Sequence, residues 1–237
     1  MTNRSGLIYT VMVLFALMNL SYRELFQENH APSVKIIAPI NSTVFKTGIP
    51  VSYRLSVTDK EDGDSKFDEI NPKEVLLEVK YIKDKSKIPG LTGKSVQDDP
   101  PGLALIRNSN CFNCHNFNGK SIGPSFFEIS KRYPATKANT DTLIKCIKDG
   151  STGVWGKEKM PSHPELTAGE IKTTVQWILK NAAVVDINYY NGTAGIIQFP
   201  INRNGIYILT ASYTDHGIKN TPEKHLKGID MITVSVR

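Results

Sequence analysis

The sequence predicts a multidomain chain of α and β parts, in which an all-α unit is inserted into an all-β sandwich behind an N-terminal apolar helix. Three observations predict it: alternating strand-like runs in both flanks, helical apolar spacing in the centre, and one long apolar run near the start. With 237 residues and 40% hydrophobic content, the chain can bury one sizeable core or two small ones.

The N-terminal apolar run covers residues 6–20, follows Arg4 and ends before Arg23. About 15 residues is short for a membrane-spanning helix and suits the apolar core of an export signal. No small-residue cleavage site stands out, so residues 1–22 are expected to be either a cleaved signal peptide or a retained membrane anchor. Either one predicts a periplasmic or other extracytoplasmic protein, tethered to the membrane by its N-terminus in the second case.

The N-terminal flank, residues 30–90, carries a strand-like pattern. Apolar and polar residues alternate in it, which predicts strands around 34–39, 51–58 and 75–82. Three strands cannot cover their own apolar face, so this flank needs a partner.

The central unit is expected to hold three short helices. One leads into residue 111, one has an apolar face at 143–147 and ends at Gly150, and one begins with Thr167 and Glu170 spaced as a capping box. So few apolar residues could hardly form a core unaided, which favours a large bound cofactor.

The C-terminal flank, residues 184–237, is expected to supply strands at 195–199, 205–215 and 231–237. Neither flank alone has the roughly seven strands of an Ig-like sandwich, but together they have its usual length. We therefore expect one sandwich built from both flanks, with the central unit inserted after the strand at 75–82.

Cys111 and Cys114 are directly followed by His115 in a chain that has three cysteines in all. A thioredoxin-like redox pair needs a βαβ context, which is missing around them. A structural zinc site needs four ligands, and beyond Cys146 only scattered histidines remain. Covalent attachment of haem c needs only two thiols for the vinyl groups and a histidine for the iron. Haem attachment is therefore favoured.

A second axial ligand for such an iron is expected well downstream. Met160, directly followed by Pro161, lies in the glycine-rich stretch 150–167 and is the candidate. His163 is the rival ligand. Because Pro161 and Pro164 flank it, a rearrangement of the loop would be awkward, and His163 is expected to be an exposed loop residue.

Four stretches of the central unit resemble small bacterial class I cytochromes c in order and spacing. They are CFNCH at 111–115, IGPSF at 122–126, KDGSTGVWGKEKMP at 148–161 and TAGEIKTTVQWILKNA at 167–182. The resemblance implies an all-α cytochrome c domain, expected over residues 96–182, with one covalently bound haem c. It also implies that Cys111 and Cys114 bind the haem, that His115 is the proximal iron ligand and that Met160 is the distal one.

The resemblance implies two further residues of the haem site. The carbonyl of Pro124 is expected to accept a hydrogen bond from the second ring nitrogen of His115 and so fix its orientation. The indole N–H of Trp155 is expected to lie beside a haem propionate. Cys146 is expected to be a half-buried thiol without a function.

The flanks resemble the Ig-like domain known as PKD, in VTDKEDG at 57–63 and GIYILTASYTD at 205–215. Residues 88–102 and 182–194 are then expected to be linkers. The acidic loop 59–69 suggests calcium, but it lacks the spacing of an EF-hand loop and is expected to be a solvated turn. Carbohydrate binding would rest on analogy of fold alone.

Two function classes follow. The favoured one is a monohaem electron carrier, not an enzyme, that passes single electrons between a periplasmic dehydrogenase and a respiratory acceptor. Similar pairs of cytochrome and PKD domains occur on sugar dehydrogenases, which suggests that kind of donor. The alternative is a haem enzyme or gas-binding sensor with an open sixth iron position. Met160 discriminates between them, because a closed His/Met pair suits electron transfer.

The composition excludes other classes. The formal net charge of +6 is modest and its basic residues are scattered, so no nucleic acid partner is expected. Attraction to an acidic protein partner remains compatible with this charge. No serine–histidine–acid set and no paired carboxylates suggest a catalytic site.

Overall fold

The computed structural model describes most of the chain. The described residues are 28–84, 86, 88, 98–184, 186–218 and 225–237. The expected signal or anchor over residues 1–22 lies outside them. Within these ranges, no helix is both long enough and apolar enough to cross a membrane.

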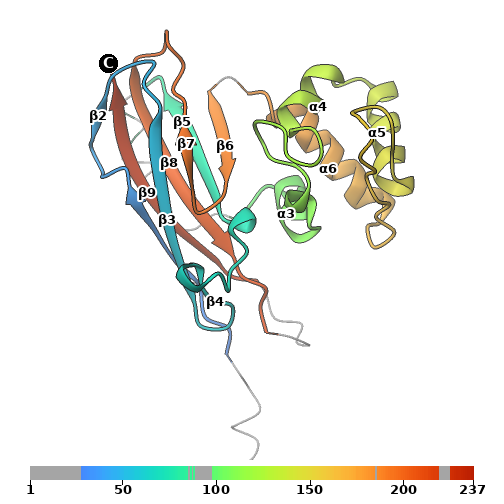
Figure 1. Cartoon of the computed structure of the whole chain (residues 1–237), viewed down its shortest axis with the longest axis horizontal. Helices are drawn as coiled ribbons and strands as arrows, with labels where there is room; N and C mark the ends of the chain where they lie inside the picture. Colours follow the sequence, from blue (N-terminus) through green and yellow to red (C-terminus); the bar gives the residue numbers. More distant parts are fainter. Residues whose placement is uncertain (1–27, 85, 87, 89–97, 185, 219–224) are drawn as a thin grey trace, which may run out of the picture.

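A part made of strands and a part made of helices lie side by side (Figure 1). We call the described residues of 28–84 and 186–237 the β part, and residues 98–184 the helical part. The strands are β1 (Ser33–Ala38), β2 (Val44–Phe45), β3 (Val51–Asp59), β4 (Gly63–Asp64), β5 (Leu76–Ile82), β6 (Ile187–Asn191), β7 (Ala194–Ile197), β8 (Gly205–Thr214) and β9 (Lys227–Val236).

The strands form two sheets. In the first, β3 pairs antiparallel with β1, β4 and β7. The second has the order β2-β9-β8-β5-β6, and all its neighbours are antiparallel except β2 and β9. Two short 3-10 helices, η1 (Ser65–Phe67) and η2 (Pro72–Glu74), lie in the chain between β4 and β5.

Both sheets join strands that precede the helical part to strands that follow it. In the first sheet, Val51 of β3 lies opposite Ile197 of β7. In the second, β5 lies between β6 and β8, so that Leu77 faces Tyr190 on one side and Ala211 on the other. The chain leaves the β part after β5 and returns to it at β6, which is the neighbouring strand.

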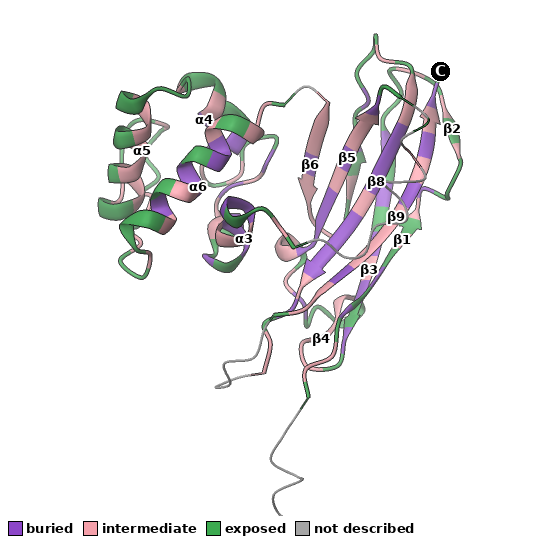
Figure 2. Ribbon diagram, turned by 180° about the vertical axis from the view of Figure 1, so that it is seen from behind, coloured by how far each residue is buried: buried purple, intermediate pink, exposed green. Residues whose placement is uncertain are grey.

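The two sheets enclose one apolar core. On β3, Val51, Tyr53, Leu55 and Val57 are buried while the residues between them are more exposed, as the alternation predicts. β8 is buried along much of its length (Figure 2). The face of β8 that points away from this core is also partly buried, because the helical part packs against part of the second sheet.

The helical part has four α-helices in its described residues, one more than the sequence predicts. They are α3 (Pro101–Asn108), α4 (Phe126–Arg132), α5 (Lys137–Asp149) and α6 (Ala168–Asn181), with a short 3-10 helix η4 (Cys111–Asn113) between α3 and α4. The capping box of Thr167 and Glu170 is present at the start of α6. Gly150 follows α5 with a φ of +81°, a conformation that favours glycine.

The structure also contains strands β2, β4 and β6, which the sequence does not predict. β6 falls inside residues 182–194, which are therefore not a plain linker. Its neighbouring residues Tyr189 and Tyr190 pack into different cores, so the strand lacks an apolar–polar alternation. The unexpected helix α4 begins at a capping box of Ser125 and Glu128, a signal that the sequence does contain.

A buried ion pair of the helical part also bonds to the β part. Arg107 of α3 lies 2.7 Å from Asp99, and both side chains are less than a tenth exposed. The guanidinium of Arg107 donates to the hydroxyl of Ser212 on β8 at 2.7 Å and to the carbonyl of Glu74 at 3.1 Å. The ammonium of Lys227 on β9 also donates to Asp99. Every partner of Asp99 named here is a cation, so its charge is compensated.

Arg107→Ala should destabilise the fold by about 3 to 5 kcal/mol, because it removes one partner of a buried pair and leaves groups unpaired. The free energy of unfolding, measured with urea, checks this. Lys137→Ala is the control, since it removes an ion pair to Asp141 that is largely exposed and should cost less than about 1 kcal/mol. Equal losses for the two variants would contradict a buried, stabilising pair.

Candidate functional site

A cavity of about 280 Å³ opens in the helical part. Its lining is mostly apolar and comes from the loops on either side of η4, from α4, α5 and α6, and from the loop between α5 and α6. The residues of chemical interest that line it are Cys111, Cys114, His115, Pro124, Cys146, Trp155, Met160 and His163. Every haem-site residue expected from the sequence therefore lies around one space.

A tight turn brings the first three of these residues together. Asn110 adopts a left-handed backbone conformation, and η4 starts immediately after it. The backbone N–H groups of Cys114 and His115 both donate to the carbonyl of Cys111, at 3.2 and 2.9 Å. The two cysteines do not pair with each other in a disulfide. Burial raises the pKa of the Cys111 thiol to about 12, whereas a redox-active cysteine needs a lowered pKa.

The ring of His115 is held by contacts on two sides. Its Nδ1 lies 2.6 Å from the carbonyl oxygen of Pro124, the partner that the sequence analysis assigns to it. Phe126 stacks against the ring, with centroids 5.4 Å apart and planes 21° apart. Burial lowers the pKa of His115, which favours the neutral imidazole. With Nδ1 donating to Pro124, Nε2 is left as a lone-pair donor, the form that binds metals.

Gly123 is required by close packing against this ring. A Cβ atom at this position would lie 2.7 Å from Cε1 of His115. The backbone N–H of Gly123 also donates to the carbonyl of Cys114 at 2.8 Å. Gly123 therefore leaves room for the ring of His115, and the carbonyl of Pro124 fixes its orientation.

The loop after α5 holds Met160 by its backbone. Met160 and Ser151 exchange two hydrogen bonds, at 2.8 and 3.1 Å, as an isolated antiparallel bridge. Gly150 fits beneath this bridge, since a Cβ there would lie 2.8 Å from the carbonyl oxygen of Met160. The position of Met160 is thus set by main-chain contacts.

His163 is not the exposed loop residue that the sequence predicts. Its side chain is only 16% exposed and lines the same cavity. Its backbone N–H donates to the carbonyl of Ile147 at 3.0 Å, and its Nδ1 lies 2.7 Å from a carboxylate oxygen of Glu165. These two contacts draw His163 inward in spite of the flanking prolines.

Trp155 is partly buried and packs against the core of the helical part. The guanidinium of Arg132, in the last turn of α4, lies 4.7 Å from the centroid of its ring. Sequence reasoning did not find Arg132, because the contact joins α4 to a loop more than twenty residues later. The pair places a cation over an indole that lines the cavity.

A family model described as Cytochrome c matches residues 101–182. Cytochrome c-551 of Azotobacter vinelandii is 37% identical to this chain over 78 residues, which are 33% of this chain and 94% of that protein. The chain belongs to the cytochrome c family. Cytochrome c-552 of Hydrogenobacter thermophilus is also 37% identical, over 75 residues that make up 32% of this chain and 76% of that protein.

A crystal structure of Nitrosomonas europaea cytochrome c552 matches with 32% identity and a TM-score of 0.31, over 32% of this chain and 95% of that chain. The family match covers the helical part alone and leaves both β-rich flanks outside it. The cytochrome c domain is thus one part of a longer chain.

Cytochromes c bind haem c covalently through a Cys-X-X-Cys-His motif, and residues 111–115 are that motif here. The structure fits the group: a mostly apolar cavity contains both thiols and a buried imidazole with one free nitrogen donor. Covalent haem c is accordingly the cofactor of this cytochrome c.

Gly123→Ala should displace the imidazole of His115 and destabilise the domain by about 1 to 3 kcal/mol, the usual cost of overpacking. Unfolding in urea and the haem content of the purified chain measure the effect. Gly169→Ala is the control, because its nearest neighbour would be 4.0 Å away, in the first turn of α6. A Gly123→Ala protein with the stability and haem content of the wild type would contradict the close packing of Gly123 against the ring of His115.

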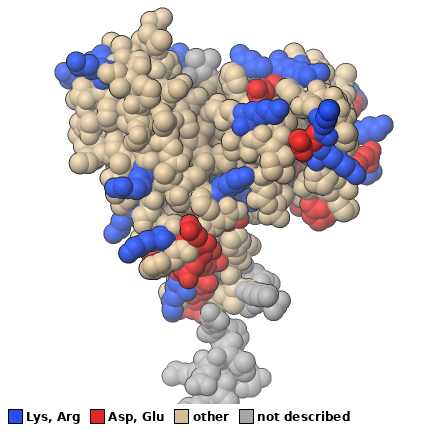
Figure 3. Space-filling view, viewed as in Figure 1, with Lys and Arg blue, Asp and Glu red and all other residues tan. Residues whose placement is uncertain are grey.

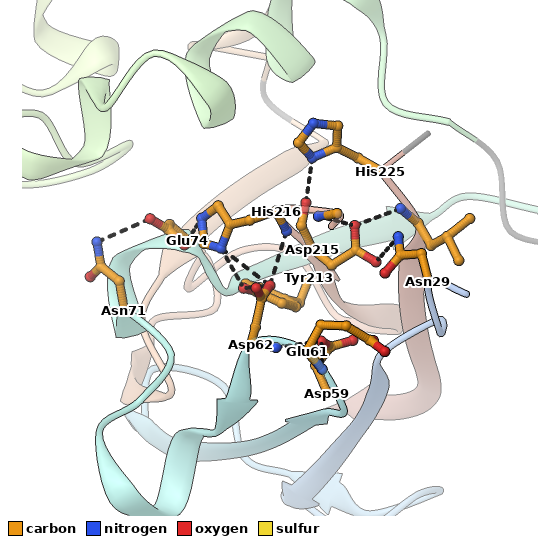
Figure 4. A network of polar contacts seen from close by, with 12 residues as sticks. Asn29, Asp59, Glu61, Asp62, Asn71, Glu74, Tyr213, Asp215, His216 and His225 are labelled. Atoms are coloured by element: carbon orange, nitrogen blue, oxygen red, sulfur yellow. Dashed lines mark hydrogen bonds and ion pairs between the residues drawn. The ribbon is translucent and has the colours of Figure 1, made fainter. Parts of the chain in front are cut away.

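The acidic loop 59–69 is fixed by hydrogen bonds within the β part (Figure 4). Oδ1 of Asp59 accepts from the backbone N–H groups two and three residues later, at 2.9 and 2.7 Å. Oδ2 of Asp62 accepts from the hydroxyl of Tyr213 at 2.7 Å and from the backbone N–H of His216 at 3.0 Å. In the part of the chain that the structure describes, no group of three or more His, Cys, Asp or Glu side chains could hold a metal ion.

His216 bridges two carboxylates of this network (Figure 4). Its Nε2 lies 3.2 Å from Glu74 and its Nδ1 lies 3.2 Å from Asp62. The hydrogen bond and the charge of Glu74, together with a smaller contribution from Asp62, raise the pKa of His216 to about 9. The imidazolium is therefore the form present at neutral pH, and it links the loop after β8 to the segments before β5.

The His216 bridge should stabilise the protein at neutral pH and lose its effect in base. The pKa of His216 rises from about 6.5 in the unfolded chain to about 9 when folded, so the stabilisation is fully present below pH 6.5 and disappears as the pH rises through 9. Urea unfolding of the wild type and of His216→Gln at a series of pH values measures it. The difference in free energy of unfolding between the two proteins should shrink as the pH rises from 6.5 through 9. A difference that does not change with pH would contradict the bridge.

Proposed function

We propose that this chain is a monohaem c-type electron carrier that passes single electrons between a periplasmic dehydrogenase and a respiratory acceptor. The observation that carries the proposal is a mostly apolar cavity that both cysteines, His115 and Met160 line together. When bound, haem c supplies an iron that gains and loses one electron reversibly.

His115 and Met160 would hold the iron, and contacts within the chain fix the ring of His115 and the backbone of Met160. The hydrogen bond from Nδ1 of His115 to Pro124 sets the tautomer and the plane of the ring. The two backbone hydrogen bonds between Met160 and Ser151 anchor the loop that presents the thioether. Two fixed ligands leave no open position for a substrate or gas, which favours electron transfer over the alternative of a haem enzyme or sensor.

Trp155 and Arg132 are proposed to receive a haem propionate at the rim of the cavity. Arg132 lies over the ring of Trp155, and it also donates to the carbonyl of Val154 at 3.3 Å. An indole N–H and a guanidinium are both donors that suit a carboxylate.

The proposed partner presents an acidic surface. Residues 101–182 contain eleven Lys and Arg against six Asp and Glu, so the helical part carries most of the formal charge of +6. In Figure 3, charged side chains gather over the helical part, while much of the β part shows none on this face. Opposite charge on the partner would speed the encounter.

For the domain arrangement, we propose that residues 30–90 and 184–237 are the two halves of one PKD-type, Ig-like sandwich and that the cytochrome domain, residues 96–182, is inserted between them. The pairing of β3 with β7 and of β5 with β6 and β8 supports it, because each pair joins the two flanks. The signal or anchor over residues 1–22, and with it the extracytoplasmic location, stays a prediction from the sequence.

Met160→Ala should open one axial position of the iron. The reduction potential should then fall, since a Met ligand raises it, and the reduced protein should bind carbon monoxide readily. Optical spectra and a redox titration measure both effects, after acid-acetone extraction of the wild type has shown that the haem stays on the polypeptide.

His163→Ala is the matched control, because His163 lines the same cavity and lies three residues from Met160. It should leave the spectra unchanged. If His163→Ala opens the iron and Met160→Ala does not, the ligand assignment is wrong. Rapid binding of carbon monoxide by the reduced wild type would instead support the gas-binding alternative.

A further inference from the structure

Strand β6 of the β part touches the chain just after the haem-binding motif. The side-chain amide of Asn118 donates to the backbone carbonyl of Tyr189 at 2.9 Å. Two residues further along β6, the side-chain amide of Asn191 donates to the side-chain oxygen of Asn116 at 3.2 Å. β6 is the edge strand of its sheet, so these contacts cover an edge that no further strand pairs with.

A second contact reaches the inside of the motif. The ammonium of Lys73, in η2 of the β part, donates to the backbone carbonyl of Asn113 at 2.8 Å. Asn113 is the residue between Phe112 and Cys114 in the sequence CFNCH. The β part therefore contacts a residue inside the motif, Asn113, as well as two residues that follow it, Asn116 and Asn118.

The side chain of Tyr189 belongs to the core of the helical part, although the residue belongs to the β part. It is 9% exposed, and its ring lies 4.8 Å from that of Phe117 and 5.9 Å from that of Trp177. Phe117 in turn lies 5.4 Å from Phe126, which stacks on His115. A continuous row of rings thus runs from β6 to the imidazole.

We propose that Tyr189 is a positioning residue for the haem, which fixes the imidazole of His115 through the two phenylalanines and thereby helps to set the reduction potential. The inference rests on the proposed function, because it takes His115 as the proximal iron ligand. It adds that one residue that positions the haem ligand of the cytochrome c domain comes from the β part of the fold.

The physical reason lies in close packing. Core rings interdigitate with few voids, so removal of the last ring in a row lets the others shift toward the gap. A shift of Phe126 would loosen the imidazole and admit water to the proximal side. A more polar surrounding favours the more highly charged oxidised iron, and the potential falls.

The neighbouring residue Tyr190 offers a matched control. It lies on the same strand but packs against the core of the β part, where its ring is 6.0 Å from that of Tyr53. Tyr190→Ala removes the same number of atoms from the opposite face of β6. It should weaken the fold without touching the row of rings that ends at His115.

The test compares the full-length, haem-loaded chain with Tyr189→Ala, Tyr189→Phe and Tyr190→Ala in redox titrations followed by optical spectra. Tyr189→Ala should lower the equilibrium constant for reduction about threefold, which for one electron is about 28 mV. Tyr189→Phe keeps the ring and should keep the wild-type potential. Tyr190→Ala should unfold at lower urea while its potential stays that of the wild type.

An unchanged potential in Tyr189→Ala, with reduced stability, would overturn the inference and leave Tyr189 as a packing residue only. If Tyr189→Ala does not fold, Tyr189→Leu decides, because it removes the ring that lies 4.8 Å from Phe117 and keeps an apolar side chain in the core. A lower potential in that variant supports the inference, and an unchanged one overturns it. Failure of the proposed function is distinct: it would appear in the wild type as haem that is not covalently bound or not ligated by His115.

Discussion

The packing of the second sheet against the helical part is the interaction on which the rest of the structure depends. The helical part is too small to enclose a core of its own, and α5 has no fully buried residue. It is completed on one side by the haem cavity and on the other by Leu76 and Tyr189 of the sheet. The same contact covers the edge strand β6 and gives Arg107 partners in η2, in β8 and in the segment before α3.

The parts of the fold that were predictable from the sequence are those with local causes. The spacing of Cys111, Cys114 and His115 is a local property of one turn, and the capping box at Thr167 lies within four residues. The strand β3 was predictable because one of its faces meets a core and the other meets water.

The parts that were missed depend on contacts between distant residues. Leu76 is buried on the face of β5 where alternation predicts exposure, because the helical part packs there. β6 lies within residues 182–194, which the sequence predicts to be a linker, because Tyr189 and Tyr190 pack into two different cores and no single-face pattern results. At the site, Gly123 is required because a side chain there would collide with the ring of His115. The backbone N–H of His163 donates to the carbonyl of Ile147, which keeps His163 at the cavity.

The neighbouring positions of β5 and β6 have a consequence for the order in which the chain folds. β5 takes both of its sheet partners, β6 and β8, from beyond the helical part, so the second sheet cannot form until that whole part has been made. Residues 98–184 are contiguous, so contacts among their helices can begin to form before β6 exists, but their core is complete only when Leu76 and Tyr189 pack against it. Until then β5 keeps unpaired edges, which are prone to aggregation. The support that β6 gives to the haem-binding segment, through Tyr189 and its bond to Asn118, therefore comes last, together with the completed sheet.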